Sequence, residues 1–162
     1  MGLEVERKFL VVSRDWERYV QKKTSLRQKA LLRDPSGATG RVRLKEGKAI
    51  VTLKGPPSAD NLSRSEFEWE VPLEQGLEMM RLFPGVGIEK TRHEVEVDGV
   101  LWEVDVFHGV NEGLVVAEAE FPSREAAEAL TVFPSWIGME VTSDKRYSNS
   151  LLEVNPWLNW GR

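Results

Sequence analysis

Hydrophobic and charged residues alternate one by one along most of this chain. The pattern opens in LEVERKF at residues 3–9 and recurs in RVRLK at 41–45 and WEVDV at 102–106. Successive side chains of a β-strand point to opposite faces of the sheet, so this period of two predicts strands with one apolar and one charged face. On this basis we expect eight strands, at residues 3–11, 25–33, 39–46, 48–54, 63–71, 87–97, 100–107 and 113–121.

A few stretches break the alternation and are typical of helices or turns. We expect helices at residues 13–23, 73–83 and 123–133, and a further short helix within residues 143–152. Ser13 and Ser123 stand where N-capping residues are preferred, and acidic residues follow both. An acidic residue followed by glycine, at 46–47 and at 98–99, predicts two tight hairpin turns, because glycine accepts the positive φ that such turns require.

The order of these elements indicates a mainly β fold of the α+β kind. No linker, repeat or low-complexity tract divides the chain, so we expect residues 1–162 to form a single domain. About eight strands joined by hairpin-length connections favour an antiparallel sheet that is strongly curved or closed into a barrel. The few helices are then expected to pack against the outside of the barrel or to close one of its ends.

The charged faces of the strands allow two interpretations. One is an ordinary half-solvated sheet, with its apolar face on a core and its charged face in water. The other is a closed barrel whose charged faces line the lumen, since eight strands enclose a space for side chains or one small ligand. The charged faces contain almost no Ser, Asn, Gln or Thr, and they segregate into acidic and basic strands. This segregation favours the second interpretation, a closed barrel with a charged lumen.

If the charged side chains converge, they form two opposed sets. The basic set is Lys8, Arg41, Arg43, Lys54, Arg64, Lys90 and Arg92, and the acidic set is Glu4, Glu6, Glu66, Glu68, Asp105, Glu118 and Glu120. Arginine forks match phosphate oxygens, and carboxylates supply the oxygen ligands that magnesium prefers. A polyanion with divalent cations satisfies both sets, which indicates phosphoryl-transfer chemistry by charge neutralisation rather than through a covalent nucleophile.

Composition narrows the chemistry further. There is no cysteine and there are only two histidines, which excludes thiol nucleophiles and histidine-rich metal sites and leaves carboxylates to hold Mg²⁺ or Mn²⁺. The net charge of −4, from 22 Lys and Arg against 26 Asp and Glu, argues against duplex nucleic acid as a partner. With no secretory signal and no apolar run of ~20 residues, we expect a cytoplasmic protein that does not bind membranes.

An ordered series of motifs resembles one known family. The series is Glu4-Val5-Glu6-Arg7-Lys8, Arg41-Val42-Arg43, Thr52-Leu53-Lys54-Gly55, Arg64-Ser65-Glu66-Phe67-Glu68, Lys90-Thr91-Arg92, Asp105, Glu118-Ala119-Glu120, and Glu140-Val141-Thr142 before Asp144-Lys145-Arg146-Tyr147. The first element alone, an E-x-E-x-K pattern, is common by chance. The whole ordered set, which spans nearly the entire chain, resembles the CYTH or triphosphate tunnel metalloenzyme superfamily, and most closely its bacterial tripolyphosphatase-type members.

The resemblance implies a fold and an activity. The fold is an eight-stranded antiparallel barrel that forms a tunnel. The activity is Mg²⁺- or Mn²⁺-dependent hydrolysis of a terminal phosphoanhydride of a linear triphosphate, with inorganic tripolyphosphate as the favoured substrate. Alternatives are a class IV-type adenylate cyclase, a thiamine triphosphatase, or a non-catalytic module that binds polyphosphate or nucleotides.

The resemblance also implies roles for individual residues. Metal ligands are Glu4, Glu6, Glu118 and Glu120, with Asp105 as a further candidate. The phosphate clamp is Arg41, Arg43, Lys54, Arg64, Lys90 and Arg92. Lys8 contacts phosphate or orients the attacking water, and Arg146 or Lys145 closes one mouth of the tunnel. Glu66 and Glu68 either serve a second metal or the water, or pair with tunnel arginines. Lys29 and Ala30 replace a glycine–tyrosine pair common in related tripolyphosphatases, so no tyrosine-assisted step is expected there.

The aromatic residues are assigned mainly to packing. Six tryptophans invite a base-stacking role, but Trp69 and Trp102 lie on the apolar faces of their strands, which fits packing better. The apolar stretch at 156–160 suits either a barrel end or the contact surface of a homodimer.

Overall fold

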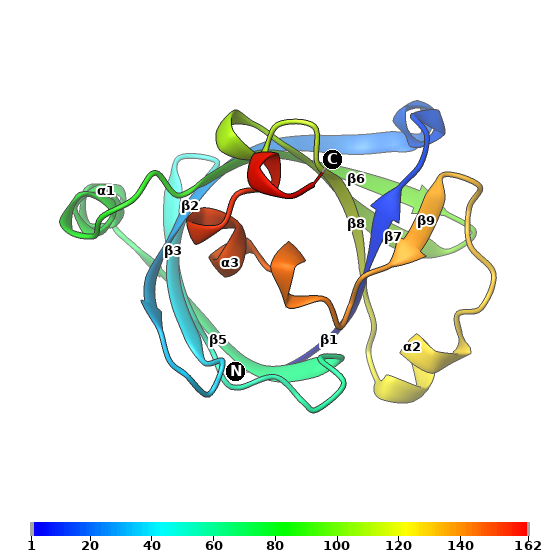
Figure 1. Ribbon diagram of the computed structural model, residues 1–162, viewed down its shortest axis with the longest axis horizontal. Coiled ribbons are helices and arrows are strands. Elements are labelled where there is room, and N and C mark those ends of the chain that lie inside the picture. The colour runs from blue at the N-terminus through cyan, green and yellow to red at the C-terminus, as the bar shows by residue number, and fades with distance from the viewer. Residues whose placement is uncertain (1, 162) are drawn as a thin grey trace.

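Nine antiparallel strands form one sheet in the computed structural model, which describes residues 2–161. The strands are β1 (Gly2–Val11), β2 (Val20–Arg33), β3 (Thr39–Lys45), β4 (Lys48–Lys54), β5 (Ser63–Val71), β6 (Ile88–Val97), β7 (Val100–Phe107), β8 (Val115–Glu120) and β9 (Ile137–Glu140). Their order is β5-β4-β3-β2-β6-β7-β8-β1-β9, and β5 also pairs with β1. This last pairing closes the first eight strands into a barrel, which confirms the expected architecture (Figure 1).

Strand β1 closes the barrel because its two halves have different neighbours. Its first half pairs with β5, where Glu4 lies opposite Arg64. Its second half pairs with β8, where Glu6 lies opposite Glu120, and its last residues also pair with β9. The hairpin turns at 46–47 and 98–99 are confirmed: all four residues have positive φ, between 52° and 78°.

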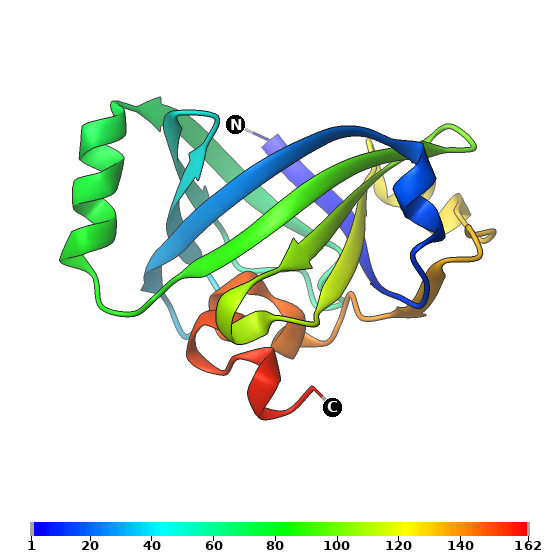
Figure 2. The same ribbon diagram turned by 90° about the horizontal axis from the view of Figure 1, so that it is seen from above.

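The helices lie around the barrel rather than within its wall. They are α1 (Leu73–Leu82), α2 (Arg124–Ala129) and α3 (Asn149–Val154), with short 3-10 turns at Asp15–Tyr19, Gly109–Asn111, Lys145–Tyr147 and Trp157–Asn159. Helices α1 and α2 pack on the outside of the barrel, and the segment that contains α3 lies across one end (Figures 1 and 2). None of the helices within residues 2–161 is long and apolar enough to cross a bilayer.

Three expected elements differ from the structure, and one strand was not expected. The helix expected at 13–23 is wrong: only Asp15–Tyr19 forms a helical turn, and β2 already begins at Val20, because this part of the chain pairs with β6. The helix expected at 123–133 ends at Ala129, although Ser123 does cap it by accepting from the Ala126 N–H. The tail at 143–152 forms a 3-10 turn and then α3 rather than one helix, and β9 was not predicted.

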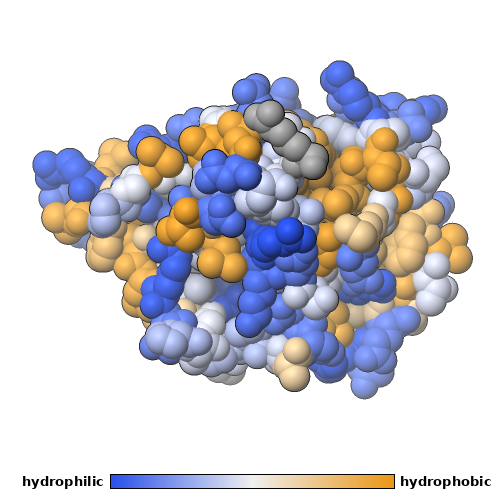
Figure 3. Space-filling view, viewed as in Figure 1, coloured by the Kyte–Doolittle hydropathy of each residue, from blue (hydrophilic) through white to orange (hydrophobic). Residues whose placement is uncertain are grey.

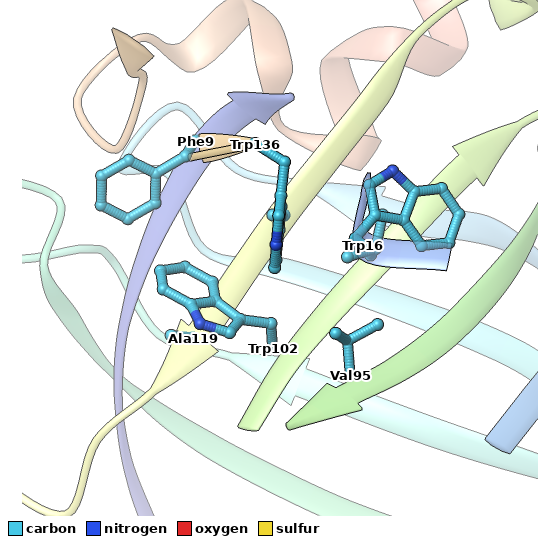
Figure 4. Close-up of a cluster of buried hydrophobic side chains, with 8 residues drawn as sticks. Phe9, Trp16, Val95, Trp102, Ala119 and Trp136 are labelled. Carbon is cyan, nitrogen blue, oxygen red and sulfur yellow. The ribbon is translucent and has the colours of Figure 1, made fainter. Parts of the chain in front are cut away.

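The main hydrophobic core lies outside the barrel wall. Phe9, Trp102 and Trp136 are each at most 2% exposed, and the Trp102 ring lies edge-on to the other two with centroids 5.6 and 5.8 Å apart. Figure 4 shows their rings gathered between β1, β7 and the segment that leads to β9. The apolar faces of the strands therefore point outward, under the covering segments, and the charged faces point inward.

A second cluster closes one end of the barrel. Inward-facing Ile88, Phe107 and Val116 pack against Tyr147 and Leu152 of the C-terminal segment. Trp157 and Trp160 pack against the same cluster, which confirms the barrel-end interpretation of the apolar tail. Viewed from this end, hydrophilic residues gather at the centre of the surface and hydrophobic ones lie mainly nearer its periphery (Figure 3). This apolar cluster fixes the C-terminal segment across the end of the barrel, while polar residues of that segment line the lumen.

Substitution of Trp102 with alanine is expected to lower the free energy of unfolding by about 3–5 kcal/mol, because the indole is fully buried and its neighbours cannot fill the cavity. Urea titration monitored by far-UV circular dichroism measures the change. Trp69→Ala is the matched control, because Trp69 is 47% exposed on the outside of β5, and its effect is expected to be much smaller. Equal losses in the two variants would contradict this placement of the core.

Candidate active site

A cavity of about 230 Å³ occupies the lumen of the barrel. The charged residues that line it are Glu4, Glu6, Lys8, Arg41, Arg43, Lys54, Arg64, Glu66, Glu68, Lys90, Arg92, Glu103, Glu118, Glu120 and Glu153. Every residue of the two sequence-derived sets is among them except Asp105. The half-solvated-sheet interpretation is therefore wrong, because closure of the sheet turns the charged faces toward one another.

Four glutamates form a carboxylate cluster on β1 and β8. Glu6 lies directly opposite Glu120, and Glu4 and Glu118 are the next inward-facing residues of the same two strands. Like charges directly opposite one another destabilise a sheet. Burial, followed by repulsion from Glu118 and Glu4, raises the pKa of Glu6 to about 8. Burial also raises the pKa of Glu4 and of Glu120. The cluster is thus short of positive charge.

This carboxylate cluster fits a hard divalent cation. Its donors are all carboxylate oxygens, which Mg²⁺ and Mn²⁺ prefer, and a cation offsets the repulsion that raises the pKa of Glu6. Within residues 2–161, no three acidic or histidine side chains already converge tightly enough to form a metal centre. A cation held here therefore needs further ligands, such as water or phosphate oxygens, as is usual for Mg²⁺.

Arginines occupy the opposite wall. Strand β3 carries Arg41 and Arg43, and two strands on one side and three on the other separate it from β1 and β8. The Nε of Arg41 is buried and has no hydrogen-bond partner. Burial, together with repulsion from Arg41 and Arg92, lowers the pKa of Arg43 to about 9. This wall therefore has an excess of positive charge that suits an anion.

Two lysines form ion pairs with members of the carboxylate cluster. Lys54 Nζ lies 2.9 Å from Glu4 and 3.4 Å from Glu66. Lys8 Nζ lies 3.5 Å from Glu118. Although burial opposes it, the positive charge of Lys8 and of Arg92 lowers the pKa of Glu118 to about 2, so this carboxylate stays ionised.

The two acidic residues of β5 that line the lumen, Glu66 and Glu68, pair with cations of the lumen. Glu68 accepts a hydrogen bond from Thr52 Oγ1 at 2.9 Å and lies 3.8 Å from Arg41. Together with the contact between Glu66 and Lys54, this favours charge pairing over metal binding for these two glutamates.

Asp105 lies behind the lumen rather than in it. It is 1% exposed, and its carboxylate contacts Lys90 Nζ at 2.7 Å and Arg92 at 2.8 and 2.9 Å. Against the effect of burial, Lys90 and Arg92 keep the pKa of Asp105 well below its usual range. Its oxygens are thus already engaged by two cations, which places Asp105 as a support for the clamp.

The two cations expected at the tunnel mouth differ in position. Lys145 lines a second cavity of about 230 Å³, which shares Glu4, Glu6 and Lys8 with the lumen and so continues it outward. Arg146 instead pairs with Asp144 and stacks over Trp160, with 4.5 Å from its guanidinium carbon to the ring centroid. The structure brings Lys145 to the mouth and Arg146 to the surface beside it.

Several lumen residues were not predicted from the sequence, among them Glu103, Gln28, Asn149 and Glu153. Glu103 lies opposite Glu118 and 3.2 Å from Arg92, and its parity with Asp105 in the strand was an available signal. Gln28 binds Arg43, Asn149 accepts from Lys90 at 3.0 Å, and Glu153 accepts from the Ala30 N–H at 2.8 Å. The last two belong to α3, and no local pattern predicts that this helix reaches the lumen.

The lumen offers no surface for stacking. Among the described residues, no Phe, Tyr, Trp or His side chain lines either the lumen cavity or its continuation at the mouth. Trp16, Trp102 and Trp136 are instead buried in the outer core, as expected for packing residues. The lumen is therefore lined mainly by charged and polar side chains.

Comparisons with known proteins agree with this geometry. Residues 2–147 match the CYTH domain family. The chain is 41% identical to a protein of Acetivibrio thermocellus named inorganic triphosphatase, over 99% of both chains, and 38% identical to a Nitrosomonas europaea protein of the same name, over 94% of this chain and 97% of the relative. A crystal structure of an inorganic triphosphatase superposes with a TM-score of 0.67 at 34% identity, covering 95% of this chain and 96% of that one.

Proposed function

Because this chain belongs to the CYTH domain family, we propose that it hydrolyses a terminal phosphoanhydride of a linear triphosphate, with inorganic tripolyphosphate as the substrate. One observation carries the proposal: a closed lumen places a carboxylate cluster opposite an arginine wall, with space for a small anion between them. A polyphosphate and a divalent cation together offset both excesses of charge.

In the proposed mechanism, the cationic side chains hold the phosphate chain. Arg41, Arg43 and Arg92 neutralise its charge and position the terminal phosphorus, which supplies the electrostatic stabilisation on which phosphoryl transfer depends. Lys8 lies beside Glu118, where its ammonium contacts a phosphate oxygen next to the carboxylates. Water attacks the terminal phosphorus, the bridging P–O bond breaks, and diphosphate and phosphate are released.

The carboxylate cluster is proposed to hold the metal ion. Glu4, Glu6, Glu118 and Glu120 are the ligands, and Mg²⁺ or Mn²⁺ is the metal that their oxygen donors favour. When bound, the metal ion polarises phosphate oxygens and lowers the pKa of a coordinated water. Asp105 holds Lys90 and Arg92 in the clamp, and Glu66 pairs with Lys54.

The absence of stacking surfaces among the described lining residues favours an inorganic substrate over a nucleotide or thiamine triphosphate. A nucleobase or a thiazolium ring gains little from a cavity lined by ionised side chains, whereas each phosphate of tripolyphosphate finds cationic donors.

An activity panel tests the proposal. Phosphate release from tripolyphosphate, ATP and thiamine triphosphate is measured with Mg²⁺, with Mn²⁺ and with excess EDTA, alongside cyclic AMP formation from ATP. We expect the highest kcat/KM with tripolyphosphate and loss of at least about 100-fold of the rate in EDTA. Binding of tripolyphosphate without turnover under all metal conditions would support a binding module instead, and cyclic AMP as the main product would support a cyclase.

A further inference from the structure

A buried glutamine faces a lumen arginine that forms no ion pair within the described residues. Gln28 of β2 and Arg43 of β3 are register partners, and both line the lumen cavity. Gln28 is 2% exposed. Its Oε1 accepts hydrogen bonds from Arg43 Nε at 2.9 Å and from Arg43 Nη2 at 2.7 Å. Because both contacts are N–H donors, they fix which end of the amide is the oxygen.

This neutral partner distinguishes Arg43 from most other cations of the lumen. Arg92 contacts Asp105 and Glu103, and Lys54 contacts Glu4 and Glu66. Within the part of the chain that the structure describes, Arg43 has no carboxylate oxygen within 4 Å. An amide oxygen fixes the direction of a guanidinium as a carboxylate does, but it leaves the positive charge uncompensated.

The remaining donors of Arg43 are free to meet an anion. Among the described residues, its Nη1 has no hydrogen-bond acceptor, and the neighbouring Arg41 Nε is buried without a partner. Burial, together with repulsion from Arg41 and Arg92, lowers the pKa of Arg43, because both disfavour its charged form. An anion between these side chains offsets both effects.

We propose that Gln28 is a positioning residue for triphosphate binding: it aims the Arg43 guanidinium into the lumen while keeping its positive charge available to the substrate. The inference rests on the proposed function, because it assumes that the ligand is a polyphosphate. It assigns two separable properties to Gln28, the hydrogen-bond acceptor and the absence of charge, and two substitutions distinguish them.

The test measures binding of inorganic tripolyphosphate by isothermal titration calorimetry in EDTA, where no turnover occurs. Gln28→Glu keeps the acceptor but adds a carboxylate that compensates Arg43, and we expect Kd to rise at least about 10-fold, with no loss of thermal stability. Gln28→Met keeps the size but removes the acceptor, and we expect a smaller rise in Kd together with a lower Tm. In steady-state assays with metal, Gln28→Glu is expected to raise KM more than it lowers kcat.

Gln21→Glu is the matched control. Gln21 lies on the same strand, is exposed next to Glu96 and does not line the lumen cavity, and its substitution changes the net charge by the same amount. We expect its Kd to stay within about twofold of the wild type. Wild-type affinity in Gln28→Glu, or an equal loss in Gln21→Glu, overturns the inference while leaving the proposed function intact. If Gln28→Glu does not fold, unchanged affinity in Gln28→Met overturns it. The proposed function is refuted separately, if the wild type releases no phosphate from tripolyphosphate with either Mg²⁺ or Mn²⁺.

Discussion

The Glu6→Gln variant is expected to lose at least about 100-fold in kcat/KM for tripolyphosphate while keeping its fold. Glu6 stands opposite Glu120 and next to Glu4 and Glu118, so its carboxylate is central to the proposed metal ligands. Glutamine has nearly the same shape, but its neutral amide oxygen is a weaker metal ligand than a carboxylate. The loss of activity should therefore appear mainly in the metal-dependent step. Rates measured over a range of Mg²⁺ concentrations show whether added metal restores part of the activity.

Stability measurements separate this loss from misfolding. In the folded, metal-free protein the pKa of Glu6 is raised to about 8, whereas the ordinary value is 4.5. The folded state therefore binds more protons than the unfolded state between these values, so this group makes folding less favourable as pH rises from about 5 to about 8. Glu6→Gln removes the group. In EDTA at pH 8 the variant is expected to be at least as stable as the wild type.

Glu70→Gln is the control for Glu6→Gln. Glu70 lies on β5 and pairs with Lys48 at 3.8 Å, and both side chains are more than half exposed outside the lumen cavity. We expect wild-type kcat/KM for this variant. Equal activity in Glu6→Gln and Glu70→Gln would show that Glu6 is not a metal ligand.

The Asp105→Asn variant is expected to lose about 3–5 kcal/mol of the free energy of unfolding, because it leaves buried Lys90 without its counter-ion and Arg92 with Glu103 alone. Lys90 and Arg92 have side-chain exposures of only 0% and 12%, so water cannot replace the lost carboxylate. The carboxylate has a depressed pKa, so its contribution is present above the ordinary Asp value and disappears as pH falls below it. Urea titrations at pH 7 and in acid should show the difference between variant and wild type shrinking below about pH 4.

Two further variants make this test specific. Asp98→Asn changes the same residue type in the exposed hairpin turn between β6 and β7, where asparagine accepts the positive φ, and its effect should lie within about 0.5 kcal/mol. Adding Lys90→Met to Asp105→Asn removes the buried ammonium that has lost its counter-ion, and it should recover part of the lost stability. If Asp105→Asn is no more destabilised than Asp98→Asn, the buried ion cluster does not support the fold as proposed.

The features that could be predicted from the sequence are those set by residues close together along the chain. Features set by contacts between distant residues could not be predicted. The alternation in residues 3–9 or 102–106 is local, because the backbone of any strand sends neighbouring side chains to opposite faces. It was sufficient to place eight of the nine strands and to identify nearly all of the charged side chains of the lumen. The segment at 13–23 shows the limit of this reasoning. Its capping signals favour a helix, yet pairing of Val20 with Val95, 75 positions later, makes most of its second half a strand.

The sequence by itself determined which charged side chains share a face and what chemistry they suit, because those properties depend on parity and residue type alone. Only the tertiary structure decided which charges meet. Closure of β1 against β5 and β8 sets Glu4 opposite Arg64 and Glu6 opposite Glu120. The C-terminal segment folds back across the end of the barrel, so that Asn149 of α3 contacts Lys90. These contacts join residues tens of positions apart, and a repeating local pattern carries no information about such pairings.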